Sequence, residues 1–182
     1  MPRKKTFQIL REGRKVGPYD DAPMLPDDIQ VQLHLSRNDV AQPFYLICEK
    51  DTLLLMMSGA GAVEFRDAPV GRFALKPGDC VYVPAGTPHR IVPDGESVML
   101  RYKPREPGLE GMAWYCGACA AEICREVWDA TTTLSQEQYW ALSARFNDDT
   151  ARRTCGKCGA VHPAVDLARF RWQEMAREIR AG

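Results

Sequence analysis

Between residues 29 and 102 the chain alternates short apolar stretches with clusters of turn residues. The breaks are rich in glycine, proline and aspartate, which favour tight turns over a continued strand or helix. Eight short strands at this close spacing predict a closed barrel or jelly roll, because alternating βαβ units would place longer helical segments between them. The expected strands are Ile29–Leu35, Phe44–Cys48, Leu53–Met57, Ala62–Phe65, Arg72–Leu75, Cys80–Val83, His89–Val92 and Val98–Tyr102.

The pattern changes after the last of these strands. Lys103–Gly111 is rich in proline and glycine and predicts a linker. A helix is expected to open near Thr133 or Ser135, either of which could cap it, and to run to about Phe146. Helical apolar spacing returns over residues 164–180 and predicts a second helix.

These patterns divide the chain into three parts. Residues 1–28, rich in proline, glycine and charge, are expected to wrap around the barrel. Residues 29–105 form the barrel, and residues 106–182 form a C-terminal extension. A chain of 182 residues is long enough for one full hydrophobic core with such an appendage.

Charge and hydropathy exclude several classes of protein. Lysine plus arginine equals aspartate plus glutamate, at 24 each, whereas binding to nucleic acid or to an acidic membrane surface needs an excess of positive charge. The longest apolar run, Leu53–Met57, is too short to span a bilayer. The basic start lacks the apolar stretch of a signal peptide. We therefore expect a cytoplasmic protein with no nucleic-acid or membrane partner.

In a cytoplasmic protein, seven cysteines indicate metal binding more strongly than disulfide bonds. Four of them form two C-x-x-C pairs, Cys116 with Cys119 and Cys155 with Cys158, and 35 residues (120–154) lie between the pairs. Four thiolates are the tetrahedral set that Zn²⁺ or a single iron ion prefers. Because four protein ligands leave no open position, we expect a structural site. The alternative is four unrelated buried thiols.

The remaining cysteines are single. Cys80 and Cys124 are expected to be core thiols. His162 follows Cys158 by four residues and is expected to support the cysteine site by a hydrogen bond or to cap the turn.

Residues 78–89, Gly-Asp-Cys-Val-Tyr-Val-Pro-Ala-Gly-Thr-Pro-His, have the form G-x5-P-x-G-x2-H. This segment resembles the second sequence motif of cupins, in which the histidine points into the barrel and binds a metal. A cupin barrel followed by Trp114-Tyr115-Cys116 and by a second cysteine pair with Val161-His162-Pro163 resembles the bacterial type of 3-hydroxyanthranilate 3,4-dioxygenase. The resemblance implies an all-β cupin (a double-stranded β-helix or jelly-roll barrel) with a small helical, rubredoxin-like C-terminal extension that binds a metal through four cysteines. It also implies a non-haem Fe(II) that opens an aromatic ring with O₂.

The iron ligands of that family are incomplete in this chain. The family holds iron with two histidines and one glutamate, and of these only His89 matches. Thr52 stands at the position of the glutamate and Leu46 at that of the first histidine. Neither side chain is an ordinary Fe(II) ligand. The family's ring cleavage is therefore not expected here.

The residues that hold the substrate also differ. The family uses two arginines and a glutamate, and these positions fall near Gln42, Pro93 and Arg101 when the motifs are aligned without gaps. Arg37 could replace the first arginine if a gap is allowed. Because Arg101 stands in place of an acid, the local charge is inverted. We predict Arg37 and Arg101 as the substrate-binding residues of a small aromatic ligand.

A different metal site could be rebuilt in the barrel. Cys48 lies where a wider cupin pattern places its second histidine, and His34 lies on a neighbouring strand. With His89 they could bind a second metal such as Fe, Cu or Zn. Alternatively, Cys48 is a small buried hydrophobe. His89 is also the candidate catalytic acid or base.

Two functions remain open, and we favour the first. The chain is a divergent oxidoreductase-like enzyme that acts on an aromatic amino or hydroxy acid, which requires a deep cavity where His89, Cys48 and Arg101 converge. Alternatively, it is a non-catalytic cupin that binds a ligand or partner and is stabilised by the structural metal. The barrel would then be filled by apolar side chains such as Leu46, Met56 and Met57.

A third functional hypothesis, which we favour less, and one analogy with the family complete the expectations. Iron in the cysteine site could transfer electrons, in which case the protein would be red. A homodimer is also expected, since cupins of this family often pair.

Overall fold

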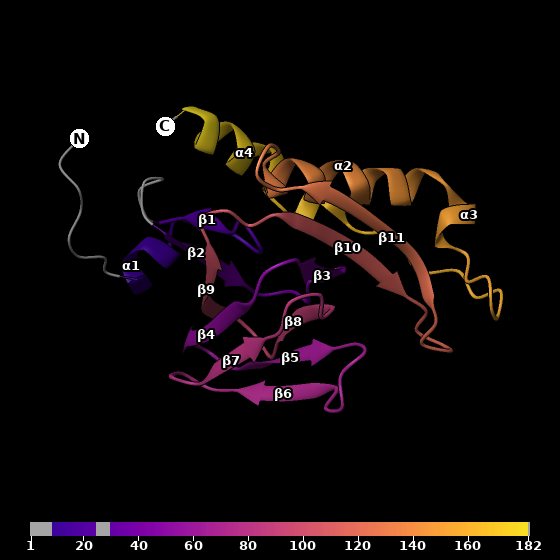
Figure 1. Cartoon of the computed structure of the whole chain (residues 1–182), viewed down its shortest axis with the longest axis horizontal. Helices are drawn as coiled ribbons and strands as arrows, with labels where there is room; N and C mark the ends of the chain where they lie inside the picture. The colour runs from indigo at the N-terminus through magenta and orange to yellow at the C-terminus, as the bar shows by residue number, and fades with distance from the viewer. Residues whose placement is uncertain (1–8, 25–29, 182) are drawn as a thin grey trace.

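The fold is seen in a computed structural model that describes residues 9–24 and 30–181 (Figure 1). Ile29 and residues 1–8 and 25–28 of the expected wrapping segment lie outside the described residues. All eight expected strands are confirmed, with bounds that move by a few residues. They are β2 (Val31–Asn38), β3 (Tyr45–Cys48), β4 (Thr52–Ser58), β5 (Gly61–Phe65), β6 (Arg72–Leu75), β7 (Cys80–Val83), β8 (His89–Pro93) and β9 (Ser97–Pro104).

The strands form two antiparallel sheets that face each other as a jelly-roll barrel. One sheet has the order β1-β2-β9-β4-β7, where β1 (Ala22–Pro23) is a short edge strand. The other has the order β11-β10-β3-β8-β5-β6. The sheets bury alternate residues between them, as in other β-sandwiches. The all-β cupin fold that the sequence indicated is thus confirmed.

The second sheet continues further along the chain than the sequence indicated. A linker over Lys103–Gly111 is wrong, because β9 runs to Pro104 and β10 (Leu109–Tyr115) begins soon after it. β10 pairs with β3 and with β11 (Glu122–Asp129), which extends the six-stranded sheet. All of its residues after Leu109 are buried, and Met112 and Trp114 belong to the main core. The division of the chain at residue 105 into separate units stays a prediction.

The helices that follow β11 lie together on one side of the sheets, beside β10 and β11 (Figure 1). The first expected helix is confirmed as α2 (Ser135–Asp148), but Leu134 is its N-cap residue and no side chain caps it. The second is shorter than expected, since Leu167–Arg169 is a 3₁₀ turn (η1). The remaining helices are α1 (Ile9–Gly13), α3 (Thr150–Arg153) and α4 (Trp172–Ala181).

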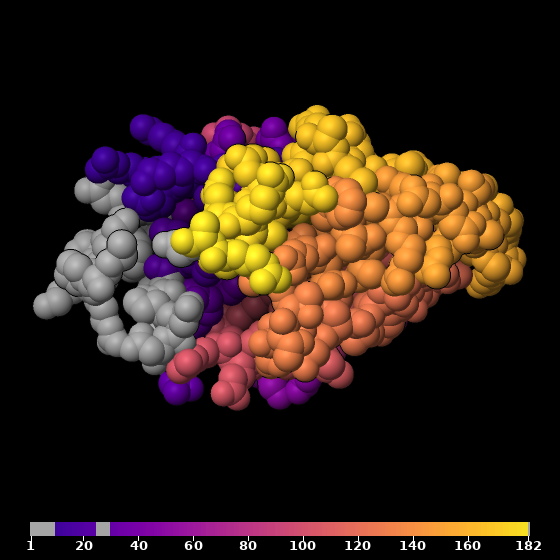
Figure 2. Space-filling model, turned by 90° about the horizontal axis from the view of Figure 1, so that it is seen from above, coloured from indigo at the N-terminus to yellow at the C-terminus, as the bar shows by residue number. Residues whose placement is uncertain are grey.

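Aromatic packing joins these helices to the barrel. Tyr139 of α2 and Trp172 of α4 lie against Phe44, with ring centroids 5.1 and 5.9 Å from it. The indole Nε1–H of Trp172 donates to the backbone oxygen of Tyr19 at 3.1 Å. Figure 2 shows the resulting contact between the C-terminal helix, in yellow, and the indigo N-terminal residues. The helices therefore cover one end of the barrel, where the polar residues described below gather.

None of the helices in residues 9–24 and 30–181 combines the length and apolar character needed to cross a membrane. Cys80 is exposed, so its expected place in the core is wrong. It begins β7, a strand in which the first and third side chains face outward and the second and fourth are buried. Cys124 is half-buried and packs against the edge of the core.

Candidate functional site

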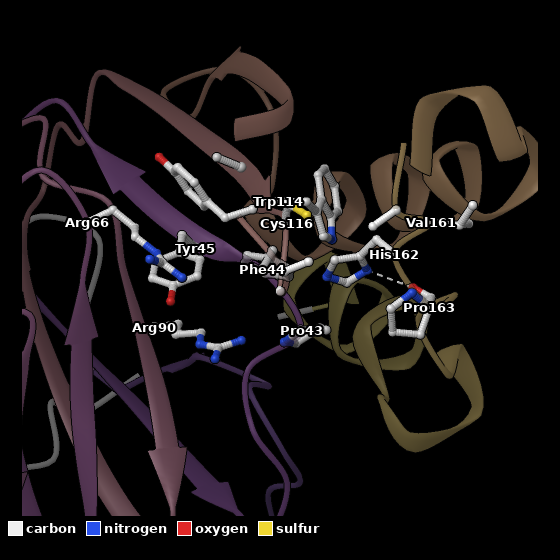
Figure 3. Close-up of a pocket in the computed structure, with 15 residues that line it drawn as sticks. Pro43, Phe44, Tyr45, Arg66, Arg90, Trp114, Cys116, Val161, His162 and Pro163 are labelled. Atoms are coloured by element: carbon white, nitrogen blue, oxygen red, sulfur yellow. Dashed lines mark hydrogen bonds between the residues drawn. The ribbon is translucent and has the colours of Figure 1, made fainter. Parts of the chain in front are cut away.

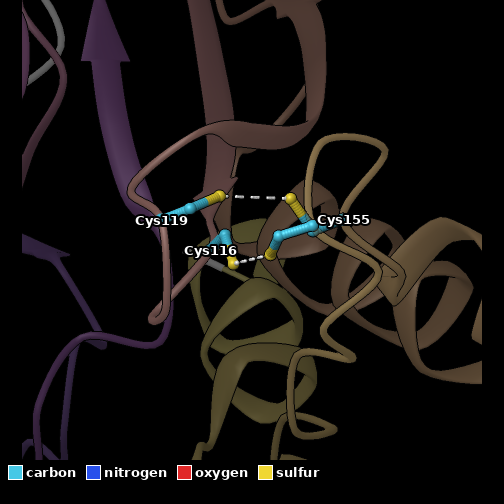
Figure 4. A group of neighbouring side chains, drawn as sticks. Cys116, Cys119 and Cys155 are labelled. Carbon is cyan, nitrogen blue, oxygen red and sulfur yellow. Dashed lines mark hydrogen bonds between the residues drawn. The ribbon is translucent and has the colours of Figure 1, made fainter.

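The four cysteines of the two C-x-x-C pairs converge at the end of β10 and in the loop after α3 (Figure 4). Their sulfur atoms all lie within 4.8 Å of one another. Cys116 faces Cys158, and Cys119 faces Cys155, each pair with 3.5 Å between sulfurs. This convergence favours one metal site over four unrelated thiols.

Each cysteine pair is held by the same backbone turn. The N–H of Ala120 donates to the oxygen of Cys116 at 2.9 Å, and that of Gly159 donates to the oxygen of Cys155 at 2.8 Å. Ala120 and Gly159 have φ angles of 58° and 74°, so both turns close through a left-handed residue. That conformation is easy for glycine and less favourable for alanine. Two matching turns thus present their sulfurs to one point.

Backbone amides in these turns favour the thiolate form of Cys116 and Cys155. The N–H groups of Cys119 and Ala118 lower the pKa of the Cys116 thiol. The N–H of Cys158 and that of the residue before it lower the pKa of Cys155 to about 6. Thiolates are the form of cysteine that binds metals.

The dimensions of the cluster fit one tetrahedral ion. A Zn–S bond of about 2.3 Å in tetrahedral geometry places sulfurs about 3.8 Å apart. The observed separations, from 3.5 Å to at most 4.8 Å, lie on both sides of this value. His162 does not belong to this group, and its Nδ1–H donates instead to the oxygen of Pro163 at 2.8 Å. The four cysteines alone would complete the coordination of such an ion.

The barrel centre has a different chemistry. His89 on β8 is fully buried, and its Nδ1–H donates to the oxygen of Thr87 at 3.0 Å. This assigns the lone pair to Nε2, which accepts an N–H of the Arg101 guanidinium at 3.0 Å. Burial, followed by the charge of Arg101, lowers the pKa of His89 to about 3. His89 is therefore a neutral acceptor whose outer nitrogen is already engaged.

Arg101 is a buried cation with few partners. It is only 3% exposed, and its Nε–H has no hydrogen-bond partner. Among the described residues no carboxylate lies within ion-pair distance of it. Burial opposes the charged form, but Asp21 and Glu110 at longer range help to raise its pKa, so the guanidinium stays charged. A buried cation with an unpaired donor is a place where an anion would bind favourably.

The two missing iron ligands are replaced by residues of the packed interior. Leu46 lies directly opposite His89 in the β3–β8 pair and is 1% exposed. Thr52 is buried at the start of β4. Because neither residue can ligate and the Nε2 of His89 accepts from Arg101, the residues present do not fit a ferrous ion at the family's position.

The other sequence-predicted barrel residues do not join His89. The thiol of Cys48 lies 4.0 Å from Glu110 Oε1, and burial raises its pKa, so it remains protonated. The Nδ1–H of His34 donates to the oxygen of Asp21 at 3.0 Å. In the described part of the chain the cysteine cluster is the only group of three or more such side chains within reach of one ion. His34, Cys48 and His89 therefore form no metal site in this arrangement.

Arg37 lies apart from the barrel interior. Its Nε–H donates to the oxygen of Val16 at 3.0 Å, and its guanidinium pairs with Glu96 at 2.7 Å on the surface. Thus the structure does not bring Arg37 and Arg101 together.

A pocket of about 190 Å³ opens at the helix-covered end of the barrel, and we call it the mouth pocket. Lys103 and Glu110 line it as a buried ion pair, with 2.5 Å between Nζ and Oε1. The hydroxyl of Ser135 donates to the other carboxylate oxygen of Glu110 at 2.8 Å. Sequence reasoning missed these residues, although Arg101 and Lys103 share the inward-facing side of β9.

The mouth pocket also contains polar groups held by α2. Gln136 donates to the backbone oxygen of Asp21 at 3.1 Å, and the Tyr139 hydroxyl donates to the Asp21 carboxylate at 3.4 Å. These bonds hold Asp21 at a φ of 44°, which is unusual for a residue other than glycine. Burial and then the charge of Lys103 lower the pKa of His34 to about 4. The pocket therefore combines a cation, the carboxylates of Asp21 and Glu110, a neutral imidazole and several donors.

Comparison with known proteins finds a match to the family model described as "AraC-like ligand binding domain" over residues 51–148, more than half of the chain. The 3-hydroxyanthranilate 3,4-dioxygenase of Podospora anserina is 35% identical over 48% of this chain and 47% of its own length. The protein of the same name from Jannaschia sp. is 25% identical over 71% of this chain and 68% of its own. These relatives confirm the sequence resemblance, and the chain spans about half the length of the Podospora relative.

Solved structures of similar shape are more distant. Hydroquinone 1,2-dioxygenase PnpCD, solved with Cd²⁺ and 4-hydroxybenzonitrile, is 22% identical with a TM-score of 0.46, over 52% of this chain and 69% of that one. A cupin-2 domain protein from Shewanella frigidimarina is 17% identical with a TM-score of 0.46, over 55% and 95% of the two chains.

Proposed function

The chain belongs to the family of AraC-like ligand binding domains, and on that premise we propose that it binds a small aromatic acid in its barrel without opening the ring by iron chemistry. The hydrogen bond from Arg101 to the Nε2 of His89 carries this proposal. A neutral imidazole has one nitrogen that can bind a metal, and in His89 this nitrogen already accepts a hydrogen bond from the guanidinium. In place of a metal cation, the barrel has an arginine.

The location of positive charge supports an acidic ligand. Arg101 and Lys103 point into the barrel from the same strand and are two residues apart, which separates them by about 7 Å. Lys103 lines the mouth pocket, and the unpaired Nε–H of Arg101 lies behind it along β9. A carboxylate that displaced part of the Lys103–Glu110 contact would pair with Lys103, and the charge of Arg101 would attract it from about 7 Å further along β9.

The size of the pocket supports a ligand with a single ring. A cavity of about 150 Å³ is enough for benzene, and the mouth pocket measures about 190 Å³. The relatives named above act, by name, on 3-hydroxyanthranilate, which is an aromatic acid of this size class. We therefore assign the same class of ligand to this chain.

The packing inside the barrel also supports binding over catalysis. The enzyme hypothesis requires His89, Cys48 and Arg101 to converge on a cavity, and none of these residues lines the mouth pocket. Leu46 and Met56 are instead fully buried in the apolar core, as the binding hypothesis requires, whereas Met57 is half-buried and packs elsewhere.

The cysteine cluster would hold a zinc or iron ion as a structural clip. Such an ion would join the loop after β10 to the loop after α3, and it would leave no coordination position for substrate. A colourless protein would identify zinc, while a red protein would revive the electron-transfer hypothesis. By analogy with the relatives we also propose a cytoplasmic homodimer.

Metal analysis tests the barrel and the cluster together. The wild type is compared with His89→Ala and with the double variant Cys116→Ser/Cys119→Ser. We expect one ion per chain, retained in His89→Ala and lost in the double variant. Two ions, one of them sensitive to His89, would contradict the proposal, and so would turnover of 3-hydroxyanthranilate by the purified protein.

Ligand binding is tested by calorimetry with 3-hydroxyanthranilate on the metal-loaded protein. The double variant Lys103→Met/Glu110→Gln removes the cation without leaving a carboxylate buried alone, and it should weaken binding at least tenfold. Lys50→Met is the matched control, because Lys50 pairs with Glu49 on the surface. Equal affinity for all three proteins, or no heat from the wild type, would overturn the assignment.

A further inference from the structure

A second cavity, of about 420 Å³, lies beside the cysteine turns, where residues from both faces of the six-stranded sheet line it (Figure 3). It shares no lining residue with the mouth pocket. Its walls are aromatic rings and two arginines, and no acidic side chain lines it. We call it the outer groove, and its principal lining residues are Phe44, Tyr45, Arg66, Arg90, Trp114 and Tyr115.

One end of the outer groove is cationic. The guanidinium of Arg66 lies 5.2 Å from the ring centroids of both Tyr45 and Tyr115. Arg90 lies 4.9 Å from the Tyr45 ring and is neutralised by Glu64 at 2.8 Å. Arg66 has no such carboxylate among the described residues, and its buried Nε–H has no hydrogen-bond partner. The aromatic faces compensate part of its charge, but its Nε–H remains available to an anion.

The other end of the groove contains an unpaired indole. Trp114 is 1% exposed, and its Nε1–H has no hydrogen-bond partner. The ring is fixed by stacking on Phe146, with centroids 4.3 Å apart. Figure 3 shows the indole nitrogen turned toward His162, on the opposite side of the groove from Arg66. Buried indole N–H groups normally find an acceptor, so this donor indicates a place for a ligand oxygen.

We propose that the outer groove is a second binding site, for a planar aromatic carboxylate. The carboxylate pairs with Arg66, the ring packs against the aromatic wall, and an oxygen at the far end accepts from Trp114. A volume of about 420 Å³ falls within the range of about 300–1,000 Å³ typical of small-molecule sites. Cys116 and the next two residues form part of the wall, so the intact cysteine turn shapes the site.

The test uses the metal-loaded protein labelled with ¹⁵N and 4-hydroxybenzoate as the probe, because its carboxylate and phenol oxygen lie at opposite ends of the ring. Trp114→Phe assigns the indole signal of Trp114 among the four tryptophans. We expect this signal to shift on titration and to saturate, while the other three indole signals report that the fold is intact. A signal that does not move overturns the proposal.

Variants locate the binding. Arg66→Gln should raise the Kd at least tenfold, whereas Arg14→Gln, which removes an exposed arginine elsewhere, should leave it unchanged. The Trp114 shift should persist in Lys103→Met/Glu110→Gln, which separates the outer groove from the mouth pocket. If Arg66→Gln binds as the wild type does, the site is wrong. If inorganic phosphate at equal concentration gives the same shift, the assignment of an aromatic ligand is wrong.

Discussion

The barrel centre and the cysteine cluster were both candidates for a metal, and they differ in how their side chains are brought together. In the cluster, the same short turn occurs twice, and each copy supplies two sulfurs. The local sequence of each turn therefore positions two of the four ligands. In the barrel, the ligands must come from several strands of both sheets. Two replacements, Leu46 and Thr52, are enough to remove the set, and Arg101 from the opposite sheet then pairs with the remaining histidine.

The barrel nevertheless keeps a positive charge at its centre. A guanidinium bonded to His89 supplies a cation where the resemblance to the dioxygenases implies an iron ion, but it cannot change oxidation state. Under the proposed function, the barrel attracts an acidic ligand but holds no ion that could activate O₂. A second cross-barrel pair, Lys103 with Glu110, repeats the arrangement nearer the mouth pocket. Substitutions in the cysteine cluster and in the barrel can therefore test the two regions separately.

The largest effect is expected in the cysteine cluster. Cys119→Ser/Cys158→Ser removes one ligand from each turn and should abolish metal binding. A structural ion contributes a large part of the folding energy of a small metal-bound unit, so we expect the Tm to fall by on the order of 20 °C. Calorimetry and metal analysis of the purified variant measure both effects.

Cys80→Ser is the control for this experiment, because Cys80 is an exposed thiol outside the cluster. It should retain the metal and the Tm of the wild type. A double variant that also keeps its Tm would show that the cluster is four thiols and not a clip.

The next effect is expected at the buried ion pair. Lys103→Met leaves the Glu110 carboxylate, 2% exposed, without its cation. Removing one partner of a buried pair costs about 3–5 kcal/mol. Urea denaturation should show this loss, and the added change Glu110→Gln should recover part of it, because glutamine can still accept from Ser135. A double variant no more stable than Lys103→Met would mean that the carboxylate is not the source of the cost.

Much of the fold could be predicted because its signals are local. Each strand between residues 31 and 104 carries its own apolar pattern, and each cysteine pair defines its own turn. β10 is missed because the prolines and glycine just before it favour a linker. The inward alternation of Glu110, Met112 and Trp114 is visible in the sequence, but a charged first member obscures it.

The barrel site could not be predicted in the same way, because its contacts join distant strands. Nothing near Arg101 in the sequence indicates that its guanidinium reaches His89, since β9 and β8 belong to different sheets. The sequence shows that Arg101 replaces an acidic residue of the family, but it does not show that Arg101 binds His89. The unpaired donors of Arg66 and Trp114 are likewise consequences of packing.

The smallest effect concerns the pH dependence of stability and sharpens the comparison at the mouth pocket. Burial and then the charge of Lys103 lower the pKa of His34 to about 4, against the opposing charges of Asp21 and Glu110. The unfolded chain takes up a proton at this histidine below its ordinary pKa of about 6.5, whereas the folded chain does not until about pH 4. The folded state therefore loses stability as the pH falls through this window.

The substitution His34→Gln should remove the part of the stability loss that comes from protonation of this histidine. Between pH 6.5 and 5 its unfolding free energy should fall less steeply than that of the wild type, by up to about 1.4 kcal/mol per pH unit. Urea denaturation at pH 8, where the ring is neutral in both states, gives the cost of the substitution itself and serves as the baseline. Parallel pH profiles for the two proteins would mean that the folded protein accepts the proton on His34 readily. In that case burial and the charge of Lys103 would not disfavour the charged form of His34 in the mouth pocket.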